Sequence, residues 1–341
     1  MLQQARSAGR GVLARVHDRT ERVLTRLRGR VLILGYHRVL SDAELHRQFV
    51  QPGMYVQERV FETHLRFLRE HFRIISFTEF FVLQHARAWD PQERYCIITF
   101  DDGWLDNYLY AYPILRRYQT PATIFVSTAV IGSEEWLWPD KLAWLLTRGG
   151  FATAAVRQRL RPLEARYPWT ARLTHRNATA QIDSAIESCK RMADRAIADL
   201  LVEMAARLDV ELPNERLFLE WRHLDEMSRA GIAFGSHGAT HRLLPRLSHA
   251  EIRAEVAGSL QTLQTRPVNW VPVFCYPNGD YDGAVVDHVE VSGYRAAVST
   301  QAGVEVWEGA DRFRLRRVGV HNDVSASIPL LAFHLSRVGR V

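Results

Sequence analysis

The fold of this chain is indicated first by Tyr95–Trp104, which reads YCIITFDDGW. Its first six residues are strand formers and mostly apolar, as in a parallel strand that is buried on both faces. Two aspartates and a glycine follow at once. Asp-Gly is a common turn signal on an exposed edge. Two carboxylates at the end of a buried strand instead need a compensating charge, and a metal ion is the usual source.

Seven further runs of the same kind lie along the chain, and helical patterns separate them. The runs are Val31–Tyr36, Phe72–Ser76, Ala122–Ser127, Ile232–Ser236, Val271–Tyr276, Arg295–Ser299 and Leu315–Val320. The helical pattern is clearest after Ser248, which forms a capping-box pattern with Glu251. Strands that alternate with helices predict an α/β fold, and eight candidate strands predict a barrel or a near-barrel.

Residues 133–224 interrupt this alternation. They open with the aromatic cluster EEWLWPDKLAWLL and continue into arginine-rich helical patterns without a strand pattern. Because the segment is too long for a simple loop, we interpret it as a largely helical insertion between two barrel strands. Its tryptophans, Trp136, Trp138 and Trp144, have two interpretations. Their faces would suit sugar rings, but tryptophans in such an insertion more often pack against one another.

Composition and charge limit the class of protein. A chain of 341 residues with 47% hydrophobic residues can bury a sizeable core in one large domain or two ordinary ones. The net charge of +6 permits an anionic partner, but no nucleic-acid-binding motif accompanies it, so we expect no nucleic acid. The scattered cysteines, Cys96, Cys189 and Cys275, predict buried thiols in a reducing compartment.

Residues 1–30 form a basic segment of their own. They contain eight arginines, and Val12, Val16, Val23 and Leu27 recur at roughly helical spacing. The segment lacks the apolar core of a secretory signal, and no stretch of the chain reaches the length of a membrane span, so we expect a cytoplasmic protein. A basic amphipathic helix can also bind an anionic bilayer, which would give a peripheral contact at the inner membrane face. A helix packed on the domain is the alternative interpretation.

Chemically active side chains follow several of the predicted strands. His37 follows the first, the two aspartates follow the strand quoted above, and the stretches HGATH, PNGD and HND follow three later ones. Because the carboxyl ends of parallel strands meet at one edge, we expect these groups to converge. The spacing of His237 and His241 would place both imidazoles on one face of a helical turn, where they can share a cation with one carboxylate. The other carboxylate could then act as a base, so the pattern predicts metal-assisted hydrolysis of an acyl bond.

The stretches TFDDG, HGATH and FCYPNGD, in this order, closely resemble the motifs of the polysaccharide deacetylase family, also known as the NodB-homology domain or carbohydrate esterase family 4. LGYHRV, YPILRRYQTPATIFVST and LRRVGVHNDVS agree with it, and the resemblance covers residues 31–325 apart from the insertion. It implies a distorted (β/α) barrel of the NodB-homology type. For residues 326–341, beyond the resemblance, we expect a C-terminal helix or tail. The resemblance also implies a hydrolase that removes an acetyl group from an N-acetylated sugar of a glycan or glycolipid precursor, with a divalent metal ion, usually zinc.

The resemblance further implies roles for individual residues. The implied catalytic residues are Asp101, as the base, and His321, as the general acid or alternatively a structural or substrate-contacting residue. The implied metal ligands are Asp102, His237 and His241. Tyr276 and Asn278 lie where the family holds the substrate or the oxyanion, and His37 is expected near the site without being a ligand. A backbone N–H near Asn278 would serve the oxyanion, a role that needs no particular side chain.

Two departures from the family pattern leave alternatives open. Many members have an arginine, which orients the catalytic base, at the position of Cys275, and the family's aspartate–tryptophan motif is absent here. The base must therefore be oriented in another way. A catalytically inert glycan-binding relative and a hydrolase of a non-sugar amide remain as alternatives. The intact pair Asp101 and Asp102 argues against the first, because a protein that only binds needs no base beside its metal ligands.

Overall fold

The computed structural model describes residues 20–47, 50–51, 53–150, 153–173, 178–212, 215–306 and 309–338. The chain forms two compact units. The barrel unit comprises the chain up to Ser41, Gly53–Ser133 and the chain from Phe218 onward; the helical unit comprises Asp42–Pro52 and Glu134–Leu217.

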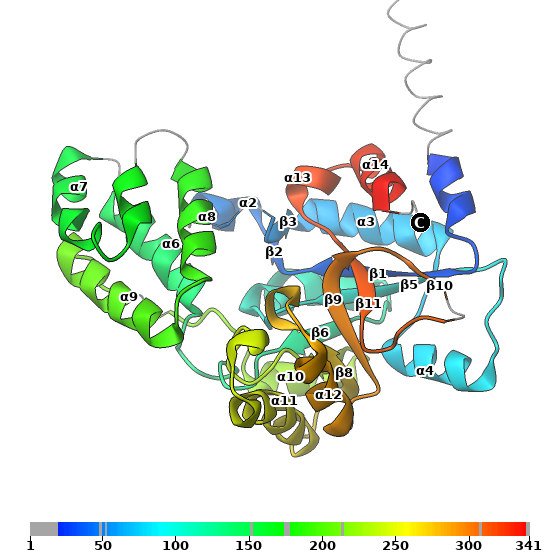
Figure 1. Cartoon of the computed structure of the whole chain (residues 1–341). Helices are drawn as coiled ribbons and strands as arrows, with labels where there is room; N and C mark the ends of the chain where they lie inside the picture. The colour runs from blue at the N-terminus through cyan, green and yellow to red at the C-terminus, as the bar shows by residue number, and fades with distance from the viewer. Residues whose placement is uncertain are drawn as a thin grey trace, which may run out of the picture. The chain divides into compact units, whose positions relative to one another are not determined.

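A closed ring of seven parallel strands forms the centre of the barrel unit (Figure 1). Around the ring they are β1 (Arg30–Tyr36), β11 (Leu315–Gly319), β9 (Ala296–Ala302), β8 (Trp270–Cys275), β7 (Ala233–Ser236), β6 (Thr123–Val126) and β5 (Arg94–Phe100), which pairs with β1. The predicted (β/α) barrel is therefore confirmed. The eighth predicted strand is short, β4 (Arg73–Ile74), and lies outside the ring, because it pairs with the start of β5 while β6 takes the end of the same edge.

Helices surround the ring. They are α3 (Glu58–His71), α4 (Phe77–Ala86), the π-helical turn η1 (Asn107–Ala111) continued by α5 (Tyr112–Arg117), α10 (Trp221–Arg229), α11 (His249–Gln264), α12 (Gly283–Val291), α13 (Asn322–Ser325) and α14 (Ile328–Val338). In Figure 1, α3, α13 and α14 lie on one side of the strands and α10, α11 and α12 on the other. The predicted capping box begins α11, where Ser248 and Glu251 exchange hydrogen bonds. Short strands complete the unit: β2 (Arg38–Leu40) with β3 (Tyr55–Gln57), and β10 (Glu305–Val306) on β1.

The pleat of the strands decides which side chains reach the interior of the ring. On β5, Tyr95 and Ile97 belong to the inner core, whereas Cys96, Ile98 and Phe100 belong to the core beneath the helices. Because side chains alternate along a strand, Asp101 continues the inner face. In the same way Arg317 follows Leu315 on β11, and Cys275 follows Val273 on β8. These polar residues thus form the uppermost layer of the barrel interior.

Residues 20–26 are helical and lead into β1. Val23, Leu24 and Leu27 are buried in the core beneath the barrel's helices. This part of the basic segment therefore uses its apolar spacing for packing, whereas Val12 and Val16 lie outside the described residues. Within the described ranges, no helix has both the length and the apolar character required to cross a bilayer.

The helical unit has a core of its own. Its helices are α2 (Asp42–Arg47), α6 (Trp138–Gly149), α7 (Ala154–Leu160), α8 (Ala178–Cys189) and α9 (Asp194–Leu208), with the 3-10 turns η2 (Arg161–Leu163) and η3 (Pro168–Arg172). Leu145, Leu200 and Met204 are fully buried in this core. The Nε1 of Trp136 donates to the Glu215 carbonyl at 2.6 Å, and its ring contacts Trp144 edge to face. These contacts favour the packing interpretation of the aromatic cluster.

Candidate active site

Asp101 and Asp102 lie at the carboxyl end of β5, and both are buried. The backbone N–H of Asp101 donates to the Tyr36 carbonyl, which extends the pairing with β1. Asp102 and Gly103 then have positive φ angles of 73° and 79°. A Cβ atom at Gly103 would lie 2.9 Å from Val126, so this turn needs a glycine. The sharp turn lets two neighbouring carboxylates face different partners.

Arg317 of β11 holds Asp101 in a buried, bidentate ion pair. Its Nη1 donates to Oδ1 at 2.7 Å, and its Nη2 donates to Oδ2 at 2.7 Å. Its Nε donates to the Ser299 carbonyl at 2.9 Å, which fixes the plane of the guanidinium. Burial raises the pKa of Asp101, but the charge and hydrogen bonds of Arg317, together with His37 and His237, outweigh burial and hold this pKa below its usual value. Asp101 is therefore ionised at neutral pH although it is buried.

Sequence reasoning missed Arg317. The family pattern has its arginine at position 275, but here the guanidinium comes from another strand, and its Nη2 also donates to Cys275 Sγ at 3.3 Å. A Cβ atom at Gly35 would lie 3.3 Å from Nη1, so the small residues at positions 35 and 275 leave room for the arginine. A signal was present in the sequence, because a charged residue at an inward position of an apolar strand needs an acidic partner.

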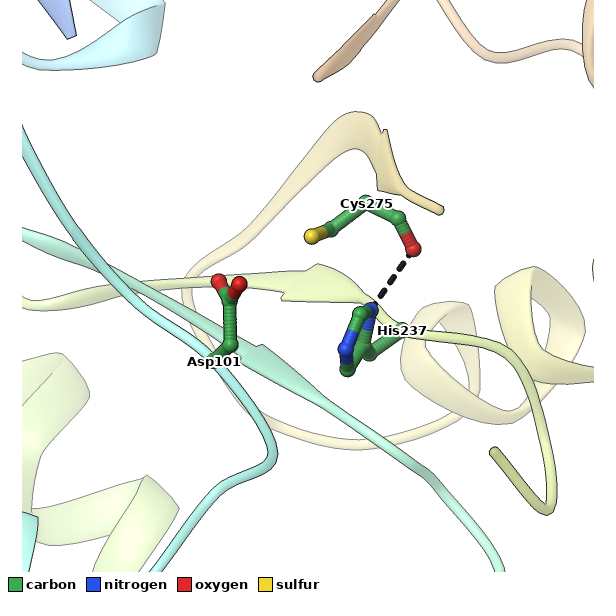
Figure 2. A group of neighbouring side chains, drawn as sticks. All are labelled: Asp101, His237 and Cys275. Atoms are coloured by element: carbon green, nitrogen blue, oxygen red, sulfur yellow. Dashed lines mark hydrogen bonds between the residues drawn. The ribbon is translucent and has the colours of Figure 1, made fainter. Parts of the chain in front are cut away.

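Asp102 faces both histidines of the HGATH stretch. Its Oδ1 is 3.3 Å from Nε2 of His237 and 3.3 Å from Nε2 of His241. Figure 2 shows the hydrogen bond from Nδ1 of His237 to the Cys275 carbonyl, 2.7 Å long. Because a carbonyl only accepts, Nδ1 carries a proton, and Nε2 faces the carboxylate of Asp102 at a separation that a second proton or a cation can bridge. Acceptor atoms that converge in this way need a cation or a proton among them.

This donor set fits a divalent metal ion. Ligands about 2.0–2.2 Å from a tetrahedral zinc ion lie about 3.3 Å apart, which matches the separations between Asp102 and the two histidines. Burial raises the pKa of Asp102, but its hydrogen bonds with the two histidines lower this pKa well below its usual value. The carboxylate is thus ionised and able to bind a cation.

A second group of possible ligands, Asp101, His237 and Cys275, is less suited to a cation. Figure 2 shows the carboxylate of Asp101 and the thiol of Cys275 turned toward each other beside the His237 ring. Both oxygens of Asp101 already accept from Arg317, whose positive charge repels a cation. Burial raises the pKa of the Cys275 thiol, which disfavours the thiolate form that binds metals. All three cysteines of the chain are buried and unbridged, as the sequence predicted.

The loop that carries His241 is not the helical turn that the HxxxH spacing predicted. Gly238 and His241 both have positive φ angles, 79° and 60°, so the chain forms an irregular loop. Glu255 of α11 supports this loop from below. Its carboxylate accepts from the backbone N–H groups of Ala239 and Thr240 at 2.8 Å each, and from the Thr240 hydroxyl. Sequence reasoning also missed Glu255, for which the signal was a carboxylate within the apolar stripe of a helix.

His37 lies at the site, beside the base. It follows β1, and its Nε2 is 3.8 Å from Oδ2 of Asp101. Its backbone carbonyl accepts from Nδ2 of Asn107 at 2.8 Å, which holds the residue in place. Burial lowers the pKa of His37 despite the nearby carboxylates, so its ring is neutral at pH 7. The structure places this ring next to Asp101 and outside the set of metal ligands.

Tyr276 and Asn278 differ in their surroundings and in their hydrogen-bond partners. The side chain of Tyr276 is buried, its hydroxyl donates to the Phe313 carbonyl at 2.9 Å, and its N–H donates to Val298. The structure thus assigns Tyr276 to the core, in contrast to the predicted substrate contact, because its polar groups are satisfied internally. Asn278 has a positive φ of 58° in the turn after β8, and its Nδ2 donates to Asp280 at 2.7 Å.

His321 immediately precedes α13 at the end of β11. Its Nδ1 is 3.1 Å from Oδ2 of Asp323, and about a quarter of its side chain is exposed. A carboxylate partner of this kind orients an imidazole. The geometry therefore gives His321 an orienting partner.

Comparison with known proteins agrees with these features. The model of the polysaccharide deacetylase family matches residues 89–297, well over half of the chain. The match includes both aspartates and both histidines of the site. The chain belongs to the polysaccharide deacetylase family. The resemblance inferred from the motifs is thereby confirmed.

Individual relatives are more distant. The poly-beta-1,6-N-acetyl-D-glucosamine N-deacetylase of Staphylococcus aureus is 29% identical over 133 residues, which are 36% of this chain and 44% of that protein. The chain thus spans less than half the length of the curated relatives that it matches. Among solved structures, the Streptococcus pyogenes deacetylase PplD, in complex with acetate, has a TM-score of 0.56 at 18% identity and covers 92% of this chain and 99% of its own. IcaB from Ammonifex degensii has a TM-score of 0.53 at 17% identity, with coverages of 90% and 97%. At these identities the structures show a shared fold.

Proposed function

We propose that this chain is a metal-dependent hydrolase that removes an acetyl group from an N-acetylated sugar of a glycan or glycolipid precursor. The observation that carries the proposal is that two adjacent buried carboxylates have different partners. Asp101 is paired with Arg317, whereas Asp102 is shared by two histidines. One carboxylate is thus kept ionised as a base, and the other is directed at a cation. The named activity of the staphylococcal relative supports an N-acetylated sugar as substrate.

Asp102, His237 and His241 would hold the metal ion, and zinc fits their donor atoms. When bound, such an ion lowers the pKa of a water molecule and polarises an acetyl carbonyl. Asp101 would take the proton of the attacking water, and Arg317 keeps its carboxylate ionised and oriented. The departing amine must gain a proton, and we propose His321, oriented by Asp323, as its source.

The test is acetate release from N-acetylhexosamine glycans and from lipid-linked N-acetylated sugars. The wild type is assayed with and without a chelator beside Asp101→Asn, and Asp225→Asn is the matched control, because Asp225 forms an exposed ion pair with Arg229 on α10. We expect release that stops with the chelator and falls by about 10²–10⁴-fold in Asp101→Asn. A wild type that binds metal yet releases no acetate from any sugar would overturn the proposal. Binding without turnover would then favour the inert glycan-binding alternative, and acetate from other amides the non-sugar amidase.

The proposed place of action is the cytoplasmic face of the membrane, where a lipid-linked precursor would be met. The basic residues 1–19 would supply the contact, because Val23 and Leu27 are already used in the core. Deletion of residues 1–19, which spares this packing, is expected to release the protein from anionic vesicles. Unchanged vesicle binding would contradict a contact through this segment.

A further inference from the structure

Trp104 connects the candidate metal site to the wall of the barrel. It follows the DDG turn, and its side chain is only 2% exposed. Its Nε1 donates to Oδ2 of Asp102 at 2.9 Å. The other oxygen of the same carboxylate, Oδ1, is the one that lies 3.3 Å from each histidine. The indole thus occupies one oxygen and leaves the other for the cation.

A buried ion pair fixes the plane of this indole. The guanidinium of Arg38 lies over the Trp104 ring, 4.4 Å from its centre, and its Nε donates to Oδ2 of Asp106 at 2.7 Å. Oδ1 of Asp106 accepts from the backbone N–H of Val39 at 3.0 Å. The ring also packs against Phe218, with 4.8 Å between ring centres. The ring cannot rotate its N–H away from Asp102 without breaking these contacts.

We propose that Trp104, held by the pair Arg38 and Asp106, is a positioning residue that makes Asp102 a one-oxygen ligand aimed between His237 and His241. A carboxylate that is free to rotate can bind a metal through either oxygen or through both, and it loses rotational entropy on binding. The indole N–H removes this freedom before the metal arrives. The inference rests on the metal site of the proposed function and extends it to residues that touch neither metal nor substrate.

The experiment measures the affinity for Zn²⁺ by competition with a chromophoric chelator, using the full chain. Trp104→Phe removes the N–H and keeps most of the ring packing. The matched control is Trp136→Phe, because this indole is also buried but donates to a backbone carbonyl of the helical unit. A second substitution places 3-benzothienylalanine at position 104. This residue has the shape of tryptophan with sulfur in place of the N–H, so it tests the hydrogen bond even where Trp104→Phe fails to fold.

We expect Zn²⁺ affinity to fall by about tenfold or more in both variants at position 104, with the melting temperature of the metal-free 3-benzothienylalanine variant close to that of the wild type. Trp136→Phe should keep the wild-type affinity. The inference is overturned when the 3-benzothienylalanine variant binds Zn²⁺ within twofold of the wild type. A wild type that binds no Zn²⁺, or that binds it equally after Asp102→Ala, overturns the proposed metal site and this inference with it.

Discussion

The barrel unit and the helical unit both pack indole side chains, but they give the indole N–H groups different partners. In the helical unit, the N–H groups of Trp136 and Trp144 donate to backbone carbonyls at the end of the same unit. At the top of the barrel, the N–H of Trp104 donates to a carboxylate. The first arrangement satisfies a polar atom within a packed core, and the second orients a charged group.

The same contrast holds for the charged side chains. In the helical unit, Glu203 pairs with Arg166 and Arg207, whose side chains are 56% and 32% exposed. At the barrel top, Asp101 and Arg317 are both almost fully buried. Exposed pairs contribute little to stability, whereas loss of one partner from a buried pair is costly. Loss of one charged partner should therefore be costly at the barrel top, for stability as well as for chemistry, and should have little effect in the helical unit.

The largest effect is expected for removal of a metal ligand. In Asp102→Ala the two histidines remain, but the anionic ligand is lost, so bound metal and acetate release should both disappear. A metal ion supplies several kcal/mol of transition-state stabilisation, and the rate should fall by at least about 10³-fold. Metal content by mass spectrometry and acetate release measure the two losses. Retained activity in the metal-depleted variant would contradict the assigned site.

The second prediction compares two adjacent arginines of β11. Arg317 is buried on Asp101, whereas Arg316 is partly exposed and pairs with Glu305. In Arg317→Met we expect kcat to fall by about 10²-fold, since the base loses its orientation and its neighbouring charge. Arg316→Met should leave kcat within about twofold, because a partly exposed pair contributes little. Equal effects of the two substitutions would show that β11 acts only through its packing.

Arg317→Met should also change the pH dependence. In the wild type, burial raises the pKa of Asp101, but Arg317 and the neighbouring histidines together outweigh burial, so the carboxylate stays ionised below its usual pKa. Activity is lost as pH falls through this lowered pKa, and so is the stability that the ion pair contributes above the unfolded-state pKa of about 4. Without Arg317 the largest contribution that opposes burial is lost, so the acid limb of kcat/KM against pH should move to higher pH. An unmoved acid limb would mean that another group controls it.

The third prediction concerns the loop of His241. Glu255 accepts three hydrogen bonds from Ala239 and Thr240, and glutamine keeps only one carbonyl oxygen for them. Glu255→Gln should lower the free energy of unfolding by about 1–3 kcal/mol and weaken metal binding several-fold. Denaturant unfolding and the chelator competition measure the two effects. Glu251→Gln on the same helix, where the carboxylate is exposed, is the control and should leave metal binding unchanged.

The smallest effect on chemistry is expected in the helical unit. Trp136→Phe removes a hydrogen bond to Glu215 and should cost about 1 kcal/mol in stability, with kcat/KM for soluble glycans unchanged. The measurement is denaturant unfolding beside steady-state kinetics. A tenfold loss of kcat/KM at unchanged stability would instead support the interpretation that this tryptophan cluster contacts sugar rings.

Local sequence patterns predicted the barrel strands and the convergence of the DD and HxxxH groups. They predicted them because a strand buried on both faces needs a continuous apolar run, and because the carboxyl ends of parallel strands share one edge. The same patterns placed β4 in the barrel and the HxxxH loop in a helical turn, and both were wrong. Spacing alone does not show which strand occupies an edge, nor the positive φ that His241 adopts.

The sequence by itself determined which charged groups and donor atoms stand at the ends of β5 and β7, because each set lies within a stretch of a few residues directly after its strand. Only the tertiary structure decided their partners. Arg317 reaches Asp101 across 216 positions of sequence, and Glu255 reaches the His241 loop from the following helix. Partnerships of this kind depend on the register between strands and on the room left by Gly35 and Cys275. A periodic pattern indicates which face of its own strand a residue occupies. The closure of the barrel decides which side chains of other strands that residue contacts.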